Sequence, residues 1–268
     1  MNQLLPQHRL QNRPDLQALA AIGLRLAEAF PHLDLGERLA VACEALPGRI
    51  VFTTSFGLED QAIAHAILSR DIAIELVTFD TGRLFPETHE VWEATEARYG
   101  RGIRALLPER HALEAWVARH GINGFRASVE TRQACCALRK VEPLMRALNG
   151  AAAWVTGIRA EQSPERAMMP FAAVDSEHRL LKLNPLLDWT RDRVWKFVRE
   201  HAVPYNALHD RGFLSIGCAP CTRAVKPDEP ERAGRWWWEQ EEKKECGLHN
   251  RPGFGLRAAA AHDAGTAR

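Results

Sequence analysis

Two pairs of cysteines are the residues whose type and spacing most clearly suggest chemistry. Cys135 and Cys136 are adjacent in "RQACCALRK", and Cys218 and Cys221 follow the C-x-x-C spacing in "SIGCAPCTR". Adjacent cysteines rarely form a disulfide with each other, because the bridge would strain the peptide between them. Four thiolates in two close pairs are instead the ligand count of a tetrahedral zinc site or of an iron–sulfur cluster.

The adjacent pair favours a cluster over zinc. Neighbouring side chains on a helix diverge by roughly 100°. Both sulfurs could therefore reach a single zinc ion, with Zn–S bonds of about 2.3 Å, only if the backbone were distorted. A cubane spreads its irons over several ångströms and accepts two divergent neighbours. We expect these four cysteines to ligate a [4Fe-4S] cluster, and four separate buried thiols are the alternative.

A further cysteine, Cys246, stands apart in "KKECGLHNRPG". Lys243, Lys244 and His249 are close to it in sequence, and positive neighbours lower the pKa of a thiol and raise its thiolate fraction. Gly247 gives the adjoining backbone freedom to move. These features predict a nucleophile on a flexible arm.

Hydroxyl-bearing and glycine-containing turns follow two of the predicted strands. The turn "TTSFGLED" offers the hydroxyls of Thr54 and Ser55, and Gly57 lets the backbone approach a ligand. This turn predicts a phosphate cradle, although it matches neither of the common glycine-rich phosphate motifs; an ordinary helix N-cap is the alternative. The second turn, "FDTGRLFPET", contains Asp80, Thr81 and Gly82. Because adjacent parallel strands end at the same edge of a sheet, the two turns predict a nucleotide-sized cleft.

Strands alternate with helices along the chain, which predicts an α/β fold with a mostly parallel sheet flanked by helices. We expect a helical N-terminal segment over 1–45, the α/β domain over 46–222, and a mobile C-terminal tail over 223–268. Expected strands cover 48–57, 72–82, 102–109, 152–160 and 179–189. Expected helices cover 15–46, 58–70, 86–100, 111–121 and 190–204, with Thr190 as the N-cap of the last.

Composition and charge narrow the classes of partner. The chain has 268 residues, 46% of them hydrophobic and 26% charged, with a formal net charge of +1. This balance is that of a soluble globular protein and predicts binding to neither nucleic acid nor membrane. The polar, proline-broken N-terminus lacks a signal-peptide core, so we expect a cytoplasmic location. Cysteines in a reducing compartment are more often metal ligands or catalysts than disulfide partners.

Taken together, the motifs resemble those of the sulfonucleotide reductases. The pieces occur in order from about residue 45 to 250: "SFG", "DTG" with "LFPET", "CC" with "LRK", "TGIRAEQSPER", "GCAPCTR" and "ECGLH". The resemblance implies an adenine nucleotide α-hydrolase-like fold of the PP-loop type, akin to the ATP pyrophosphatases. It also implies reduction of adenylyl sulfate to sulfite and AMP in assimilatory sulfate reduction and cysteine biosynthesis.

The mechanism that the resemblance implies assigns roles to the cysteines. Cys246 attacks the sulfate sulfur, AMP leaves, and a cysteine S-sulfonate remains, from which thioredoxin or glutaredoxin releases sulfite. The four paired cysteines hold the [4Fe-4S] cluster, and their presence favours adenylyl sulfate over its 3′-phosphorylated form. Lys140, one helical turn beyond Cys136, is expected to bridge cluster and substrate as a catalytic residue.

Other cations follow the same motifs. The resemblance implies that Arg232, Arg235 and His249 bind the phosphosulfate, and that Arg159 points into the same cleft. A solvated surface charge is the alternative for each arginine, and for Arg166 as well. The triple tryptophan at 236–238 is expected to pack against the body, with a partner-docking patch as the alternative.

Three other functions compete with this interpretation. The same reaction on 3′-phosphoadenylyl sulfate remains open. An ATP pyrophosphatase that modifies tRNA would have an S-G-G-x-D-S loop and a basic surface, and neither is present in the sequence. A zinc-stabilised nucleotide-binding module without catalysis would leave Cys246 unexplained. A homo-oligomer is compatible with the sequence.

Overall fold

The computed structural model describes residues 15–239. The α-helices of this part are α1 (Leu16–Ala29), α2 (Leu35–Ala45), α3 (Leu58–Ser69), α4 (Pro86–Tyr99), α5 (Arg110–His120), α6 (Val129–Cys136), α7 (Glu142–Leu148), α8 (Pro164–Ala167) and α9 (Arg191–Glu200). The strands are β1 (Ile50–Thr54), β2 (Ile74–Phe79), β3 (Arg104–Leu106), β4 (Ala153–Val155), β5 (Ala172–Asp175) and β6 (Leu180–Leu183).

The strands form one sheet in the order β3-β2-β1-β4-β6-β5. All neighbouring pairs are parallel except β5 and β6, which are antiparallel. The predicted α/β fold with a mostly parallel sheet is therefore confirmed. The strand order reverses between β1 and β4, and ligands of open α/β sheets bind beyond the carboxyl ends of the strands at such a point.

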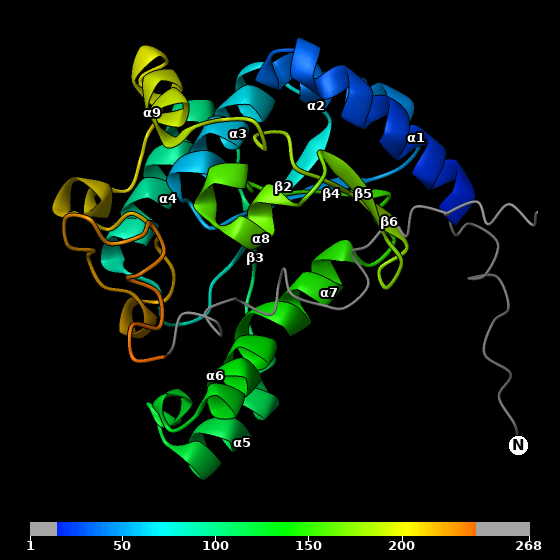
Figure 1. Ribbon diagram of the computed structural model, residues 1–268. Coiled ribbons are helices and arrows are strands. Elements are labelled where there is room, and N and C mark those ends of the chain that lie inside the picture. The colour runs from blue at the N-terminus through cyan, green and yellow to red at the C-terminus, as the bar shows by residue number, and fades with distance from the viewer. Residues whose placement is uncertain (1–14, 240–268) are drawn as a thin grey trace, which may run out of the picture.

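Helices cover both faces of the sheet (Figure 1). α1, α2, α3 and α9 pack on one face around the main hydrophobic core, to which β1, β4 and β6 contribute. On the other face, Leu144 and Leu148 of α7 pack against Val51 and Trp154. The N-terminal helices thus share their core with the sheet. Thr190 caps α9 as predicted, because its side chain accepts a hydrogen bond from the backbone N–H of Arg193.

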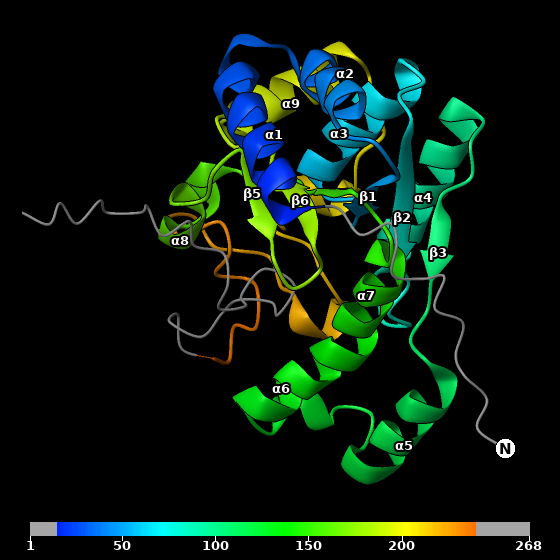
Figure 2. The same ribbon diagram turned by 90° about the vertical axis from the view of Figure 1, so that its right-hand side faces the viewer.

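α5 and α6 extend away from the sheet, beyond α7 (Figure 2). α6 ends at Cys136 and continues through a π-helical turn, Ala137–Val141, directly into α7. π-helical turns are rare and are frequent at functional sites. The tandem cysteines therefore lie where the backbone departs from regular α-helical geometry.

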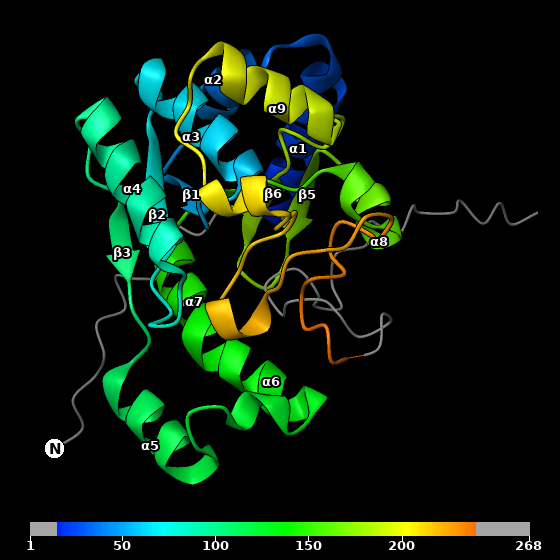
Figure 3. The same ribbon diagram turned by 90° about the vertical axis from the view of Figure 1, so that its left-hand side faces the viewer.

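Residues 223–239, assigned from the sequence to a mobile tail, pack against the body (Figure 3). The backbone N–H of Trp236 donates to the carbonyl of Cys221, and Arg223 and Gly234 are likewise joined through their backbones. Trp236 is 1% exposed, which confirms the packing role expected for it, whereas its neighbour Trp237 is 37% exposed. This segment, which we call the 223–239 loop, therefore has a defined place beside Cys221.

The expected strands were too long, and one strand was not predicted. β5 lies over Ala172–Asp175, where no element was predicted, and it pairs with β6 along its whole length. β4 ends at Val155, so the following residues of the predicted strand form a loop. Within residues 15–239, none of the helices combines the length and apolar character needed to cross a membrane.

Candidate functional site

A cavity of about 190 Å³ opens at the carboxyl ends of β1, β2 and β4. Its lining includes Thr54, Ser55 and Gly57 after β1, Thr81 after β2, and Thr156 and Gly157 after β4. Phe79 and Trp154 add aromatic surface to its wall. The cavity thus lies at the strand-order reversal, where the sequence predicted a cleft between two turns.

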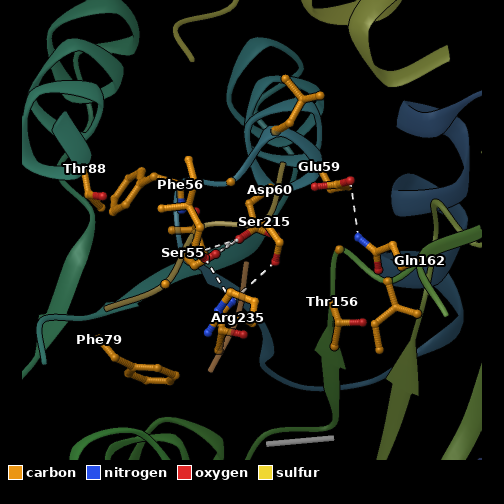
Figure 4. Close-up of a pocket in the computed structure, with 18 of the residues that line it drawn as sticks. Ser55, Phe56, Glu59, Asp60, Phe79, Thr88, Thr156, Gln162, Ser215 and Arg235 are labelled. Atoms are coloured by element: carbon orange, nitrogen blue, oxygen red, sulfur yellow. Dashed lines mark hydrogen bonds between the residues drawn. The ribbon is translucent and has the colours of Figure 1, made fainter. Parts of the chain in front are cut away.

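The turn after β1 is held by its own polar groups (Figure 4). The backbone N–H and the hydroxyl of Ser55 donate to the Asp60 carboxylate at 2.6 and 2.8 Å, and the backbone N–H of Phe56 donates to Thr54 Oγ1 at 3.0 Å. Phe56 adopts a left-handed backbone conformation with φ of 57°, which is energetically costly for a residue other than glycine. Burial of its ring, which stacks on Trp92, offsets this cost. Burial raises the pKa of Asp60 to about 6. The turn presents a preformed concave backbone to the cavity.

In the turn after β2, one of the three predicted residues lines the cavity and the other two shape the turn. Thr81 lines the cavity, and its hydroxyl lies 3.3 Å from Cys218 Sγ. Asp80 and Gly82 shape the turn, because the backbone N–H of Gly82 donates to Asp80 Oδ1 at 2.8 Å and Gly82 has φ of +67°. Thr81 therefore connects the nucleotide-sized cavity to one of the paired cysteines.

The four paired cysteines are brought together as predicted. Cys135 and Cys136 lie at the end of α6. Cys218 and Cys221 lie at the short 3-10 helix Ala219–Cys221, and all four cysteines line one small cavity. They pack in one cluster with Phe125 and Trp236. Burial raises the pKa of the Cys221 thiol to about 12 and also raises that of Cys135. These sulfurs would ionise only in the presence of a strong positive partner.

The surroundings of the four sulfurs fit an anionic metal–sulfur cluster. Arg83, Arg139 and Lys140 line the same cavity. Among the described residues, the buried Nε of Arg139 and the indole Nε1 of Trp236 have no hydrogen-bond acceptor. Arg139 lines the cavity of the four thiols and Trp236 packs in the same cluster of side chains, so an anionic group held there would lie among buried donors that lack acceptors. Within residues 15–239 the side chains as placed form no group of three or more His, Cys, Asp or Glu that could hold a metal ion, so the cluster stays a prediction that rests on this donor set.

Lys140 lies at the junction of the two cavities and lines both of them. It belongs to the π-helical turn that follows the tandem cysteines. In that turn the backbone N–H of Glu142 donates to the carbonyl of Ala137, five residues earlier. The structure thus places this lysine where one charge can act on both sites.

Three arginines join Lys140 along the wall of the larger cavity. Arg166, Arg232 and Arg235 all line it. Arg235 is buried over the ring of Trp236 and donates to Ser215 Oγ at 3.4 Å, a bond drawn in Figure 4. Arg166 donates to Gln162 Oε1 at 2.5 Å. Arg232 and Arg235 thus line the cleft, as their predicted role requires, although binding of the phosphosulfate by them stays a prediction. Arg166 is a cavity residue rather than a surface charge.

Arg159 differs from the expectation that it points into the cleft. It is fully buried behind the cavity wall, and its guanidinium is bound by the carboxylates of Glu59, Glu161 and Glu231. An arginine can be buried only if its charge and donors are satisfied, and here carboxylates from three separate segments do so. A direct contact between Arg159 and a substrate stays a prediction that this arrangement does not favour.

Two acidic residues of the cavity, Glu59 and Glu231, were not predicted from the sequence. Glu59 and Glu231 line the cavity although its other charged groups are mainly cationic, and Gln162 donates to Glu59 at 3.3 Å (Figure 4). Only their neighbours in the sequence could have indicated them, because Glu59 follows the turn after the first strand and Glu231 directly precedes Arg232. Cys246 and His249, predicted as nucleophile and substrate ligand, lie outside the described residues.

Comparison with known proteins agrees with this site. Residues 49–224 match the family described as "Phosphoadenosine phosphosulfate reductase domain". A protein from Sinorhizobium fredii (strain USDA 257), named adenosine 5′-phosphosulfate reductase, is 53% identical over 233 residues, covering 87% of this chain and 92% of that protein. One of the same name from Allochromatium vinosum is 51% identical over 228 residues, covering 85% of this chain and 88% of that protein.

A solved structure extends the likeness to three dimensions. The phosphoadenylyl-sulfate reductase of Candida auris, crystallised with phosphate, superposes with a TM-score of 0.63 at 29% identity, covering 75% of this chain and 95% of that one. The predicted resemblance to the sulfonucleotide reductases is therefore confirmed. The chain belongs to the phosphoadenosine phosphosulfate reductase family.

Proposed function

We propose that this protein reduces adenylyl sulfate to sulfite and AMP. The observation that carries the proposal is the shared wall at Lys140, between a cationic nucleotide-sized cavity and a cavity of four buried thiols. Adenylyl sulfate has an adenosine part that suits the aromatic wall and a phosphosulfate whose charge suits the cations. The names of the 53% and 51% identical relatives support the same substrate.

In the proposed first step, the Cys246 thiolate attacks the sulfur of the sulfate group. A sulfur–sulfur bond forms, the bond from sulfur to the bridging oxygen breaks, and AMP leaves with the electron pair of that bond. Lys140, Arg232 and Arg235 stabilise the charge that grows on the departing phosphate. His249, by the family resemblance, adds a further contact to the phosphosulfate.

In the proposed second step, a reduced dithiol protein regenerates the enzyme. A thiolate of thioredoxin or glutaredoxin attacks Cys246 Sγ, and sulfite leaves with the electron pair of the sulfur–sulfur bond. The second thiol of the donor then resolves the mixed disulfide and frees Cys246. The dithiol supplies both electrons, and sulfite enters cysteine biosynthesis as the product of assimilatory sulfate reduction.

Cys135, Cys136, Cys218 and Cys221 are the residues that would hold a [4Fe-4S] cluster. When bound, such a cluster would supply a fixed negative charge next to the cations of the larger cavity. Arg139 and Lys140 balance that charge from the cavity wall. Basic side chains line both cavities and can therefore hold two anions close together.

A second substrate has a specific observation in its favour. The solved relative from Candida auris is named for the 3′-phosphorylated nucleotide. The relatives at 53% and 51% identity are named for the nucleotide without that extra phosphate, and they are more similar to this chain. We therefore expect adenylyl sulfate to be the better substrate.

The test is sulfite release by anaerobically purified protein with reduced thioredoxin. We expect sulfite and AMP in equal amounts from adenylyl sulfate, with a lower kcat/KM for the 3′-phosphorylated form. A higher kcat/KM for that form would reverse the choice of substrate. Release of pyrophosphate from ATP without any sulfite from either nucleotide would instead indicate an ATP pyrophosphatase.

A further inference from the structure

Arg159 lies at the centre of a buried ionic network behind the cavity wall. Its side chain is 0% exposed. Nε donates to Glu59 at 2.7 Å, Nη1 donates to Glu161 at 2.6 Å, and Nη2 donates to both oxygens of Glu231 at 3.0 and 2.8 Å. All three nitrogens of the guanidinium are therefore engaged by protein carboxylates.

The network joins three segments that are distant in sequence. Glu59 is in the first turn of α3, Glu161 is in the short 3-10 helix after β4, and Glu231 is in the 223–239 loop. Arg191, at the start of α9, lies 3.6 Å from Glu231 and donates its backbone N–H to Glu161 at 2.7 Å. Arg159 thus ties the 223–239 loop to the body of the domain.

Glu231 is the residue immediately before Arg232, and both line the cavity. The Glu231 side chain is 14% exposed, whereas the Glu161 side chain on the same arginine is 51% exposed. Burial and the neighbouring Glu59 charge raise the pKa of Glu231, and Arg159 opposes that rise. A buried carboxylate of this kind keeps its charge and its place only while its arginine is present.

We propose that Arg159 is a positioning residue: through Glu231 it holds the 223–239 loop in place, so that Arg232 and Arg235 face the substrate's phosphate. Arg159 touches carboxylates rather than substrate. The identity of the ligand rests on the proposed function, but the ionic latch between Arg159 and Glu231 does not. The latch explains why acidic residues line a cavity that binds an anion: they fix the cations that contact it.

The test compares Glu231→Gln with Glu161→Gln in the full-length holoprotein. Each substitution removes one carboxylate from Arg159, but only Glu231 belongs to the 223–239 loop. The affinities for AMP and for adenosine are measured by anaerobic calorimetry. Hydrogen–deuterium exchange of residues 223–239 is measured by mass spectrometry without any ligand.

For Glu231→Gln we expect AMP affinity to fall about tenfold, adenosine affinity to stay within about twofold, and exchange in the 223–239 loop to rise. Adenosine lacks the phosphate that the loop arginines contact, so it reports on the rest of the cavity. Glu161→Gln should leave both affinities within about twofold of the unmodified protein and the loop exchange unchanged.

Two results would overturn the latch: equal losses of AMP and adenosine affinity in Glu231→Gln, or loop exchange that is the same in both variants. Arg159→Lys keeps the charge but loses the forked donors, and it should reproduce the Glu231→Gln pattern. If the unmodified protein releases no sulfite, the proposed function fails, while the exchange experiment still decides whether the latch exists.

Discussion

At the scale of single residues, Lys140 makes the most direct prediction because it lines both cavities. Lys140→Ala should keep the absorbance of the cluster near 400 nm but slow formation of the S-sulfonate by about 10²–10³-fold, the usual cost of losing one charge-stabilising group. Rapid-quench single turnovers with adenylyl sulfate measure this rate. An unchanged rate would remove the proposed role of Lys140.

Cys136 tests whether the four buried thiols act as ligands. Cys136→Ser should lose both the absorbance and the activity, because an iron–sulfur cluster needs all four thiolates. Cys43→Ser is the matched control, since Cys43 packs against the main core and should leave both properties unchanged. Full iron content with normal turnover in Cys136→Ser would contradict the ligand assignment.

The side chains that hold the site illustrate what residue types alone can predict. The tandem cysteines and the C-x-x-C spacing are specific enough that their meeting in one cavity could be predicted. Arg159 was assigned to the cleft because nothing in the sequence distinguishes a substrate-binding arginine from one that is saturated by carboxylates. That distinction depends on Glu59 and Glu231, which only the fold brings together.

At the scale of elements, α3 and α9 pack through a histidine pair away from the cavity. The rings of His65 and His201 lie with their centroids 4.8 Å apart at an interplanar angle of 52°, and His65 Nδ1 is hydrogen-bonded to the Tyr99 hydroxyl. Burial, and to a lesser extent the charges of His201, Arg98 and Arg70, together lower the pKa of His65 from 6.5 to about 4. The unfolded chain therefore binds a proton at this position in a pH range where the folded protein does not.

Because the unfolded chain binds this proton more readily, the free energy of unfolding decreases as the pH falls. The contribution of His65 to stability is complete above its unfolded pKa and is lost as the pH falls from 6.5 toward 4. His65→Gln keeps a hydrogen-bonding partner for Tyr99 but does not titrate. Between pH 7 and 5 we expect Tm of the unmodified protein to fall by about 2–4 °C more than that of His65→Gln, as scanning calorimetry would measure. Parallel profiles would contradict the assignment.

The conformation of the 223–239 loop requires a glycine at position 234, which packs directly against the backbone of Arg223. A Cβ added at Gly234 would lie 2.3 Å from the carbonyl oxygen of Arg223, which cannot move without breaking the loop's own hydrogen bond. Gly234→Ala should therefore lower AMP affinity at least tenfold by displacing Arg232 and Arg235. Gly102→Ala is the control, because its added Cβ meets nothing nearer than 3.9 Å. Equal affinities in the two variants would contradict this account of the loop.

Element type was more predictable from the sequence than element extent. The buried apolar runs and their polar turns identified β1, β2 and β4, but the predicted strands included residues that leave the sheet once the ladder pairing ends. β5 was not predicted because its four residues, AAVD, show no alternation of apolar and polar side chains. The π-helical turn at Ala137–Val141 likewise left no pattern that spacing could reveal.

At the scale of the whole molecule, the sheet topology brings the site together. The strand-order reversal between β1 and β4 opens the nucleotide-sized cavity, and the tandem cysteines at the end of α6 line the smaller cavity that shares Lys140 with it. The 223–239 loop then returns to that rim and adds Arg232 and Arg235. Each motif could be identified locally, but only this long-range arrangement shows that the cavity of the four cysteines adjoins the cavity lined by Arg232 and Arg235, with Lys140 lining both.

The central claim is that the paired cysteines and cations serve a thiolate that attacks the sulfur of adenylyl sulfate. Its most direct test is the intact mass of the anaerobically purified protein after one turnover with adenylyl sulfate and no reductant. We expect a gain of one SO₃ group, which is absent in Cys246→Ser although that variant keeps its absorbance and AMP affinity. An unmodified mass in cluster-loaded protein, with either nucleotide, would rule out the attack of Cys246 on the sulfate sulfur.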